Sequence, residues 1–337
     1  MKDVAKSILA IHNADGSSLA RVISLSGFGG RNTGELLGIL GKEFVGSLMY
    51  GSFDSELINM KKILDDQDAN GVTRVISTGD KDAVASGLAC GGIATIALER
   101  ITGLLQRALV AISKKLPVGI ATRIDNDVAE TVAIQILGET TRVDPNCKFD
   151  EDFISQTSLI LSDLVKLRRD SSTVKEVKGI GLHFQVYVAP SEVLVVGESV
   201  LAQALQAQFE LLGIETHLKD DVDTALEILA EFGPNDALIL LTHDMEVGLK
   251  LCEQSFEIPE MYIGALGSRH TQELRRKLLE AAGFSLLQVN SIFGPVGFDI
   301  GAKTPSETAV AIVAEFLAHK NGRSGLSLVV SNDPING

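Results

Sequence analysis

The sequence predicts an α/β protein in which an N-terminal α+β domain precedes a doubly wound parallel sheet. Three observations support this prediction. From Glu192 onward, short and continuous apolar runs alternate regularly with segments of helical apolar spacing. In the N-terminal half, short β-rich runs alternate instead with glycine-rich turns. The length of 337 residues also corresponds to about two domains.

In the N-terminal half, the runs rich in β-branched residues predict strands, and one apolar pattern with helical spacing predicts a helix. The predicted strands are Leu19–Leu25, Phe44–Met49, Cys90–Leu98, Pro117–Ile124 and Thr131–Leu137, and the predicted helix is Gly103–Lys115. The quartet Gly38-Ile39-Leu40-Gly41 resembles Gln135-Ile136-Leu137-Gly138. Such an echo could mark two similar hairpins, but we interpret it as a chance match.

A polar and charged stretch separates the two halves of the sequence. We expect an N-terminal domain over 1–147, a linker with a bridging strand over 148–190, a C-terminal domain over 191–325 and a tail over 326–337. Within the linker, Ser158–Leu167 has helical apolar spacing, and His183–Val188 alternates as a strand does.

The C-terminal domain has the clearest pattern in the chain. Its predicted strands are Val193–Val196, Ile214–Leu218, Ala237–Leu241 and Met261–Ala265, and its predicted helices are Val200–Leu212, Asp223–Glu231, Met245–Gln254, Arg269–Ala282 and Ser306–His319. Continuously apolar strands that alternate with helices of this length imply a parallel sheet covered on both faces. This is the pattern of a Rossmann-like domain.

Composition and charge restrict the class of protein. With 30 Lys+Arg against 44 Asp+Glu, the net charge is -14, which argues against a nucleic-acid partner and against binding to an anionic membrane. We find no signal-peptide pattern and no apolar stretch long enough to span a bilayer. The three cysteines lack metal-ligand spacing. We therefore expect a soluble, cytoplasmic protein.

The first turn of the C-terminal domain partly fits a dinucleotide-binding loop. Gly197 follows the first predicted strand, but Ser199 stands where a second glycine would let backbone approach a pyrophosphate, and Glu198 adds a negative charge. Asp220 ends the second strand, where a ribose-binding carboxylate belongs. Binding of NAD(P) is therefore one interpretation, and a Rossmann-like scaffold with an altered loop is the other.

Two further strand ends carry polar groups. His243, within Thr242-His243-Asp244, could bind a ligand or carry a proton; alternatively, it is a loop histidine beside a helix cap. In the second group, the glycine turn at Gly267 leads to Ser268 as N-cap and Arg269 at the first helical position. Such a helix start suits a phosphate or carboxylate, although capping alone also explains these residues.

Glycine-rich loops supply the remaining candidates. Gly294–Gly301 surrounds one carboxylate, Asp299, and leads into the capping box Thr304-Pro305-Ser306-Glu307, so we interpret it as a loop that faces a ligand. Near the N-terminus, Ser26–Arg31 offers backbone N–H groups together with the Arg31 guanidinium. Cys90 precedes two glycines, although a buried cysteine is usually inert.

In this order along the chain, these motifs resemble those of the XdhC/CoxI family, the accessory proteins of molybdenum hydroxylases. The resemblance covers nearly the whole chain. It is strongest over Tyr262–Arg269 and over Pro295–Glu307, the second of which is similar to the family signature Pro-Ile-Gly-Leu-Asp-Ile-Gly-Ala-x-Thr-Pro-x-Glu. Thr242-His243-Asp244 and Cys90-Gly91-Gly92 also fit the family pattern.

The resemblance implies a protein that binds, protects and delivers molybdenum cofactor, a molybdopterin, to an apo-hydroxylase such as xanthine dehydrogenase. It also implies a homodimer and contact with a cysteine desulfurase. Arg31, Ser268 and Arg269 would hold the anionic end of the cofactor, Asp299 would face the pterin, and Cys90 would be the thiol near sulfur or metal. These roles make the protein a chaperone for cofactor insertion more than a catalyst.

The sequence departs from the family pattern at several places, which indicates a divergent member. The family segment Gly-Ser-x-Pro-Arg is here Gly27-Phe28-Gly29-Gly30-Arg31, and Ser52 stands where the family has a cysteine. Two alternatives therefore stay open. One is an NAD(P)-binding oxidoreductase that uses Gly197, Asp220 and His243, and the other is a partner protein that binds no ligand.

Overall fold

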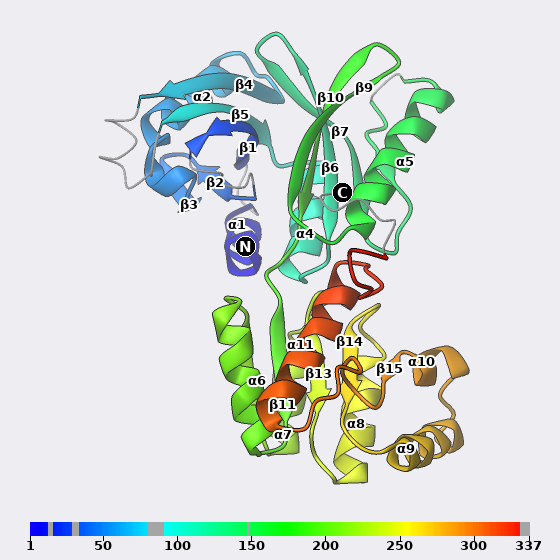
Figure 1. The fold of residues 1–337 in the computed structure, drawn as a ribbon. Helices are drawn as coiled ribbons and strands as arrows, with labels where there is room; N and C mark the ends of the chain where they lie inside the picture. Colours follow the sequence, from blue (N-terminus) through cyan, green and yellow to red (C-terminus); the bar gives the residue numbers. More distant parts are fainter. Residues whose placement is uncertain (13–15, 29–33, 80–90, 147–148, 331–337) are drawn as a thin grey trace. The chain divides into compact units, whose positions relative to one another are not determined.

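A computed structural model describes residues 1–12, 16–28, 34–79, 91–146 and 149–330 (Figure 1). The chain forms two compact units, Met1–Ala189 and Pro190–Gly337. No helix in the described ranges is long and apolar enough to cross a bilayer.

The first unit begins with a helix and a five-stranded antiparallel sheet. Its elements are α1 (Lys2–His12), β1 (Ser18–Gly27), β2 (Leu36–Leu40), β3 (Glu43–Gly46), α2 (Asp54–Asp66), β4 (Gly71–Thr78) and β5 (Gly92–Arg100). The strand order is β3-β2-β1-β5-β4. The apolar faces of these strands pack with α2, and Phe28 and Phe53 meet edge to face in this core.

The rest of the first unit repeats this arrangement. Its elements are α4 (Gly103–Ser113), β6 (Val118–Asp125), β7 (Val128–Ile136), β8 (Arg142–Val143), α5 (Glu151–Lys166), β9 (Ser171–Val177) and β10 (Ile180–Tyr187). The strand order is β8-β7-β6-β10-β9, and all neighbours are again antiparallel. Helix, three strands, helix and two strands therefore occur twice in the same order.

Strand register supports the repeat. Ser18 pairs with Ile39 in the first sheet, and Val118 pairs with Ile136 in the second. This register places Gly38-Ile39-Leu40-Gly41 and Gln135-Ile136-Leu137-Gly138 at the same point, the end of the second strand and the turn that follows. Both turn glycines, Gly41 and Gly138, have positive φ. Because the two quartets occupy equivalent positions, we interpret their similarity as part of an internal repeat and not as the chance match expected from the sequence.

Several elements of this unit differ from the sequence-based expectation. The helices α1 and α2 and the strands β2, β4, β8 and β9 were not predicted. Within 148–190, α5 and β10 overlap the predicted helix Ser158–Leu167 and the predicted strand His183–Val188, whereas β9 is new. Because β10 pairs with β6, this stretch is part of the first unit. Charged residues hid β9 because this edge strand is largely exposed, and both Lys175 and Glu176 are exposed on it.

A buried guanidinium joins the two sheets of the first unit. Arg21 on β1 is fully buried and forms an ion pair with Glu99 on β5. Its other donors cross to the second sheet, where they reach Gln185 Oε1 at 3.0 Å and Thr122 Oγ1 at 3.0 Å. Glu99 accepts from the backbone N–H of Thr131 at 2.6 Å. Such a pair requires this full set of partners, since an uncompensated buried charge is costly.

We expect Glu99→Gln to destabilise the first unit by about 3–5 kcal/mol, because the substitution leaves the Arg21 charge buried and unpaired. Glu56→Gln is the matched control. Glu56 pairs with Arg74 at 3.2 Å on the surface, where both side chains are partly exposed, so its loss is worth about 0–1 kcal/mol. Urea unfolding, with hydrogen exchange of β1 to identify the unit, measures both. Equal effects of the two substitutions would contradict this role.

The second unit is a parallel sheet with helices on both faces (Figure 1). Its elements are β11 (Glu192–Val196), α6 (Val200–Leu211), β12 (Glu215–Lys219), α7 (Val222–Leu229), β13 (Ala237–Leu240), α8 (Met245–Ser255), β14 (Tyr262–Ala265), α9 (Arg269–Ala281), α10 (Leu286–Asn290), β15 (Ile292–Phe293) and α11 (Pro305–Lys320). The strand order is β12-β11-β13-β14-β15, and every neighbouring pair is parallel.

Alternate residues of each strand enter two different cores, as strand geometry requires. Val193 and Val195 of β11 face α6 and α11, where Phe209 and Phe316 pack edge to face. The intervening residues face α7, α8 and α9. The predicted Rossmann-like fold class is therefore confirmed, with α10 and β15 as elements that the sequence did not reveal. Both are only two to five residues long, too short to show periodicity.

Candidate functional site

The loops that follow the five parallel strands meet at one edge of the second unit's sheet. Ligands of open α/β sheets bind at this carboxyl edge, most often where the strand order reverses. In this sheet the reversal lies between β11 and β13, since β12 is on one side of β11 and the later strands are on the other. Most sequence-predicted site residues come to this edge: Gly197, Asp220, His243, Gly267, Ser268, Arg269 and Asp299.

The Gly197 turn lies at this reversal and depends on glycine. Its φ is +116°, and a Cβ atom there would lie 2.9 Å from the backbone nitrogen of Thr242. The backbone of the turn is held on both sides, because Gly197 N donates to Lys219 O at 2.9 Å and Thr242 N donates to Val196 O at 3.0 Å. Only a residue without a side chain allows the β11 turn to approach the end of β13 so closely.

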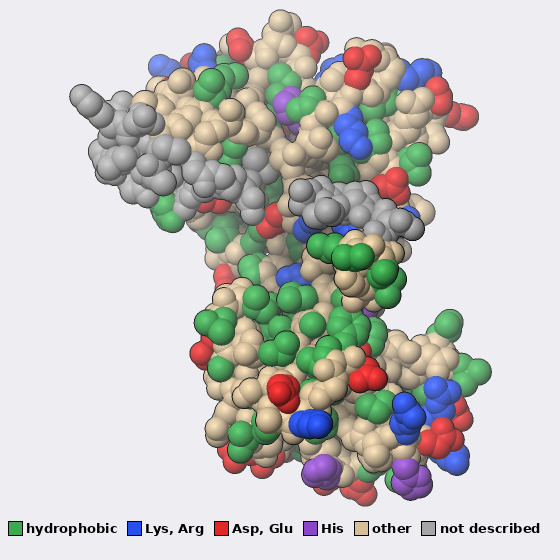
Figure 2. All heavy atoms as spheres, in the orientation of Figure 1, with side chains coloured by type: hydrophobic (Ala, Val, Ile, Leu, Met, Phe, Trp, Pro, Cys, Tyr) green, Lys and Arg blue, Asp and Glu red, His purple; other side chains and the backbone are tan. Residues whose placement is uncertain are grey.

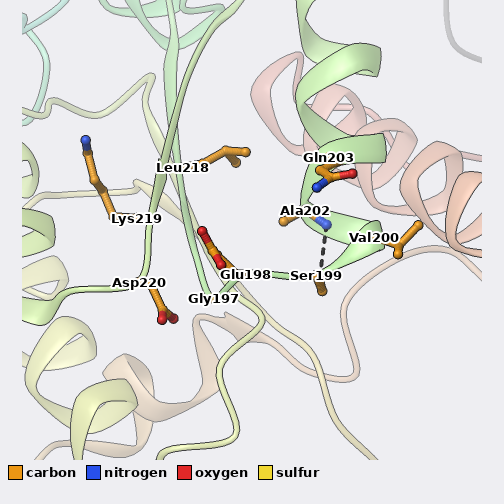
Figure 3. A pocket seen from close by; sticks show the side chains of 9 residues that line it. All are labelled: Gly197, Glu198, Ser199, Val200, Ala202, Gln203, Leu218, Lys219 and Asp220. Carbon is orange, nitrogen blue, oxygen red and sulfur yellow. Dashed lines mark hydrogen bonds between the residues drawn. The ribbon is translucent and has the colours of Figure 1, made fainter.

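A pocket of about 370 Å³ opens beside this turn (Figure 3). It is lined by Gly197, Glu198, Ser199, Val200, Ala202, Gln203, Leu218, Lys219 and Asp220. Figure 3 shows the carboxylates of Glu198 and Asp220 close to the Gly197 turn, with the Lys219 side chain directed away from them. Among the described residues, no ion pair joins Lys219 to either carboxylate. The pocket wall is thus rich in hydrogen-bond acceptors.

The start of α6 is already capped by its own sequence. Ser199 is the N-cap, and its Oγ accepts from the backbone N–H of Ala202 at 3.1 Å. In a dinucleotide loop this helix start carries the pyrophosphate. Here Glu198 places a carboxylate beside this helix start, so this end of the pocket disfavours a diphosphate.

His243 lies in the exposed loop between β13 and α8. The neighbouring Asp244 is the N-cap of α8 and accepts from Glu246 N at 2.9 Å and Val247 N at 3.2 Å. Asp244 therefore caps α8, as the alternative interpretation of this motif expects. His243 itself lies at the carboxyl edge but does not line the pocket beside Gly197.

The Ser268–Arg269 motif forms the predicted helix start. Ser268 is the N-cap of α9, its Oγ accepts from Thr271 N at 3.2 Å, and Arg269 is the first helical residue. Gly267 has a φ of +136°, and a Cβ there would meet the Thr271 side chain at 3.0 Å. The exposed Arg269 guanidinium and the positive end of the helix dipole therefore lie together at the carboxyl edge.

The glycine-rich loop after β15 is tied to the sheet and to α11. Val296 N donates to Ala265 O at 3.1 Å, and Gly297 N donates to Glu315 Oε2 at 2.9 Å. Tyr262 Oη donates to the same carboxylate oxygen at 2.7 Å. Asp299 is exposed on this anchored loop. The loop is followed by the predicted capping box, with Thr304 as N-cap of α11 and Pro305 at its first turn.

Two candidates cannot be placed. Arg31 and Cys90 lie outside the described residues. Of the cysteines, Cys252 is described; it is fully buried in the core between β13 and α8, and burial raises the pKa of its thiol to about 12. It is therefore an inert packing residue, as expected. The described residues contain no group of three or more His, Cys, Asp or Glu side chains that could hold a metal ion.

A second pocket, of about 190 Å³, was not anticipated from the sequence. It lies between α9, α10 and the start of the loop after β15, and Arg269, Arg275 and Arg276 line it. The run Glu273-Leu274-Arg275-Arg276-Lys277 is the signal that could have drawn attention to it. A charged run on a helix is usually a solvated face, however, and only the structure shows that Arg275 is buried.

The fold and these loops define a Rossmann domain, and comparison with known proteins gives its family. Residues 193–316 match the sequence model of the XdhC Rossmann domain. The molybdenum cofactor insertion chaperone PaoD of Escherichia coli (strain K12) is 29% identical over 152 residues, 45% of this chain and 46% of PaoD. The uncharacterized protein YqeB of the same organism is 32% identical over 112 residues, 33% of this chain and 20% of YqeB.

Residues 193–316 are therefore similar to the Rossmann domain of the XdhC family, and the identity to PaoD is consistent with this likeness. The matched segments span less than half of the length of either relative. A solved structure described as a xanthine dehydrogenase from Bacillus halodurans is 18% identical and covers 98% of both chains. Its TM-score is 0.44, a likeness too loose to indicate function.

Gly197→Ala should destabilise the second unit by at least about 1–3 kcal/mol, because alanine is strained at this φ and its Cβ meets the end of β13. Gly248→Ala is the matched control. Gly248 lies inside α8, and apart from that helix's own backbone no atom lies within 4 Å of the place that a Cβ would occupy. Alanine there should be neutral or stabilise by up to about 1 kcal/mol. Thermal unfolding measures both variants. A stable Gly197→Ala protein would show that the turn can relax.

The cap of α11 should weaken in acid. The backbone N–H groups of Lys303 and Thr304 donate to the Glu307 carboxylate and lower its pKa from the ordinary value of 4.5. Since the folded pKa is the lower one, the stabilisation is present above pH 4.5 and is lost as the pH falls through the folded pKa. The protection of those two amides from hydrogen exchange, relative to the intrinsic exchange rate at each pH, should therefore fall over that range. In Glu307→Gln, which keeps the cap but cannot ionise, this loss of protection should be absent.

Proposed function

We propose that this chain binds molybdenum cofactor and delivers it to a molybdenum hydroxylase, acting as an accessory protein more than as a catalyst. Two findings support the proposal: the XdhC Rossmann domain and the identity to PaoD, which is named as a molybdenum cofactor insertion chaperone. The observation that carries it is at the carboxyl edge, where an acceptor-rich pocket and an arginine-bearing helix start occur in one unit.

The chemistry of this edge fits the two ends of a molybdopterin. The pterin ring presents amino and ring N–H donors, which charged carboxylates accept well. Glu198 and Asp220 supply two such acceptors in a pocket of about 370 Å³. Asp299 is a further exposed acceptor, on the loop that follows β15 at the same edge of the sheet. The phosphate of the cofactor suits Ser268 and Arg269, where helix dipole and guanidinium act together. When bound, the cofactor supplies the molybdenum chemistry; the chain holds and orients it.

A delivery role implies partners and a setting. We propose an apo-hydroxylase such as xanthine dehydrogenase as the recipient, a cysteine desulfurase as the source of the terminal sulfur, and a homodimer in the cytoplasm as the acting form. Size-exclusion chromatography with light scattering tests the homodimer, and pull-down with each candidate partner tests the rest.

NAD(P) binding to the Gly197 pocket is the second candidate. Asp220 favours it, because this residue lines the pocket at the end of the second strand, where a ribose-binding carboxylate is found in dinucleotide folds. The Glu198 carboxylate beside the start of α6 counts against it. In this alternative His243 would be the proton carrier of an oxidoreductase.

To test the proposal, the protein is produced in a host that makes molybdenum cofactor, and its molybdenum and oxidised pterin fluorescence are measured per chain. Near-stoichiometric pterin supports the carrier. Absence of pterin would contradict it, provided that PaoD from the same host carries pterin. Titration with NAD+ and NADP+ in a thermal-shift assay then decides whether a dinucleotide binds instead.

Asp220→Asn should lower the affinity for pterin by about tenfold to a hundredfold, because it replaces a charged acceptor with a neutral one. Asp223→Asn is the matched control: Asp223 is exposed in the first turn of α7 and does not line the pocket. Pterin content after identical purification compares the two. If both variants retain full pterin, the pocket beside Gly197 does not hold the ring.

A further inference from the structure

The second pocket of the C-terminal unit gathers positive charge in a chain whose net charge is -14. Its lining residues are Arg269, Gln272, Glu273, Arg275, Arg276, Leu279, Val289, Ile292, Gly294 and Pro295. Three of these are arginines and one is a glutamate. The Glu273 carboxylate lies 3.5 Å from the ammonium of Lys277, so part of its charge is already met outside the pocket.

Arg275 is the unusual member of this set. It is only 4% exposed, yet no ion pair joins it to a carboxylate among the described residues. Its Nη1 donates to Gln272 Oε1, while its Nε is buried with no hydrogen-bond partner. A buried guanidinium with an unused donor and no counter-charge is costly unless an anion completes it.

The surroundings hold these donors in place. Gln272, which accepts from Arg275, also donates through Nε2 to Ala265 O at 2.9 Å, so the end of β14 fixes it. Gly294 leaves room for this side chain, since a Cβ there would lie 2.5 Å from Gln272 Oε1. Arg276 Nη2 donates to Asn290 Oδ1 at 3.0 Å, which positions it from α10. Figure 2 shows Lys and Arg side chains gathered on the surface in the region of α9.

We infer that the pocket between α9, α10 and β15 binds the phosphate group of a phosphorylated small molecule, with Arg269, Arg275 and Arg276 as its ligands. The volume of about 190 Å³ suits such a compact oxyanion better than a ring system. Planar guanidinium groups recognise phosphate through paired N–H donors. The inference rests on the proposed function only for the identity of the phosphorylated molecule, since phosphate binding itself needs no pterin.

Inorganic phosphate is the first probe. Titrated into the intact protein at constant ionic strength, it should raise the Tm of the C-terminal unit by about 2–4 °C once its concentration is several times the dissociation constant. Arg276→Gln should weaken phosphate binding about tenfold, because one charge-assisted contact is lost. Lys250→Gln, which removes an exposed positive charge of α8 outside the pocket, should bind like the wild type.

Two results would overturn the inference. One is a phosphate response of the wild type no larger than the response to an equal ionic strength of chloride. The other is an Arg276→Gln protein, folded by circular dichroism, that responds to phosphate as fully as Lys250→Gln does. The second comparison matters because phosphate also stabilises proteins without binding a site, and that general effect is the same in all three proteins.

Pterin content then separates the two sources of the phosphate. If Arg276→Gln loses bound pterin together with phosphate binding, the pocket takes the phosphate end of the cofactor. If it loses phosphate binding and keeps pterin, the pocket takes free phosphate or another phosphorylated ligand. Both results support the pocket as a phosphate site. If Asp220→Asn loses pterin but still binds phosphate, the pocket beside Gly197 and the pocket between α9, α10 and β15 bind their ligands independently.

Discussion

The architecture of the first unit depends on one buried cation. Arg21 leaves β1 with no route to solvent, and its charge is met by Glu99 of its own sheet and by polar groups of the other. Because these partners come from strands far apart in sequence, the two antiparallel sheets have to meet in one register for the charge to be satisfied. Apolar packing alone would tolerate small sliding of one sheet over the other. A buried ion pair with fixed hydrogen bonds restricts that freedom.

A different constraint organises the second unit. Parallel strands deliver all their following loops to one edge, so residues far apart in the chain converge without any specific contact between them. The site residues therefore owe their proximity to topology. Their individual roles depend on local features: the left-handed Gly197 turn, the serine caps of α6 and α9, and the hydrogen bonds that anchor the loop after β15.

The second unit could be predicted from the sequence almost element by element, because strands buried on both faces are continuously apolar and their helices begin with recognisable caps such as Ser268 and Thr304. The first unit was harder. Edge strands such as β9 mix polar and apolar residues, and α2 lacks the cap hydrogen bond that would have marked its start. At the site, strand ends and glycine turns were visible in advance. The burial of Arg275 was not, since an arginine in a charged run is expected on a solvated face and only tertiary packing buries it.

The internal repeat of the first unit allows one half to serve as a reference for the other. In the second half, β6 and β7 are joined by Asn126-Asp127, and β9 and β10 by Lys178-Gly179, turns as short as a hairpin permits. The corresponding connections in the first half are 28–35 and 79–91. The repeated arrangement of helices and strands therefore forms without connections of this length. Arg31 and Cys90 are found in these two longer connections, to which the second half has no counterpart of similar length.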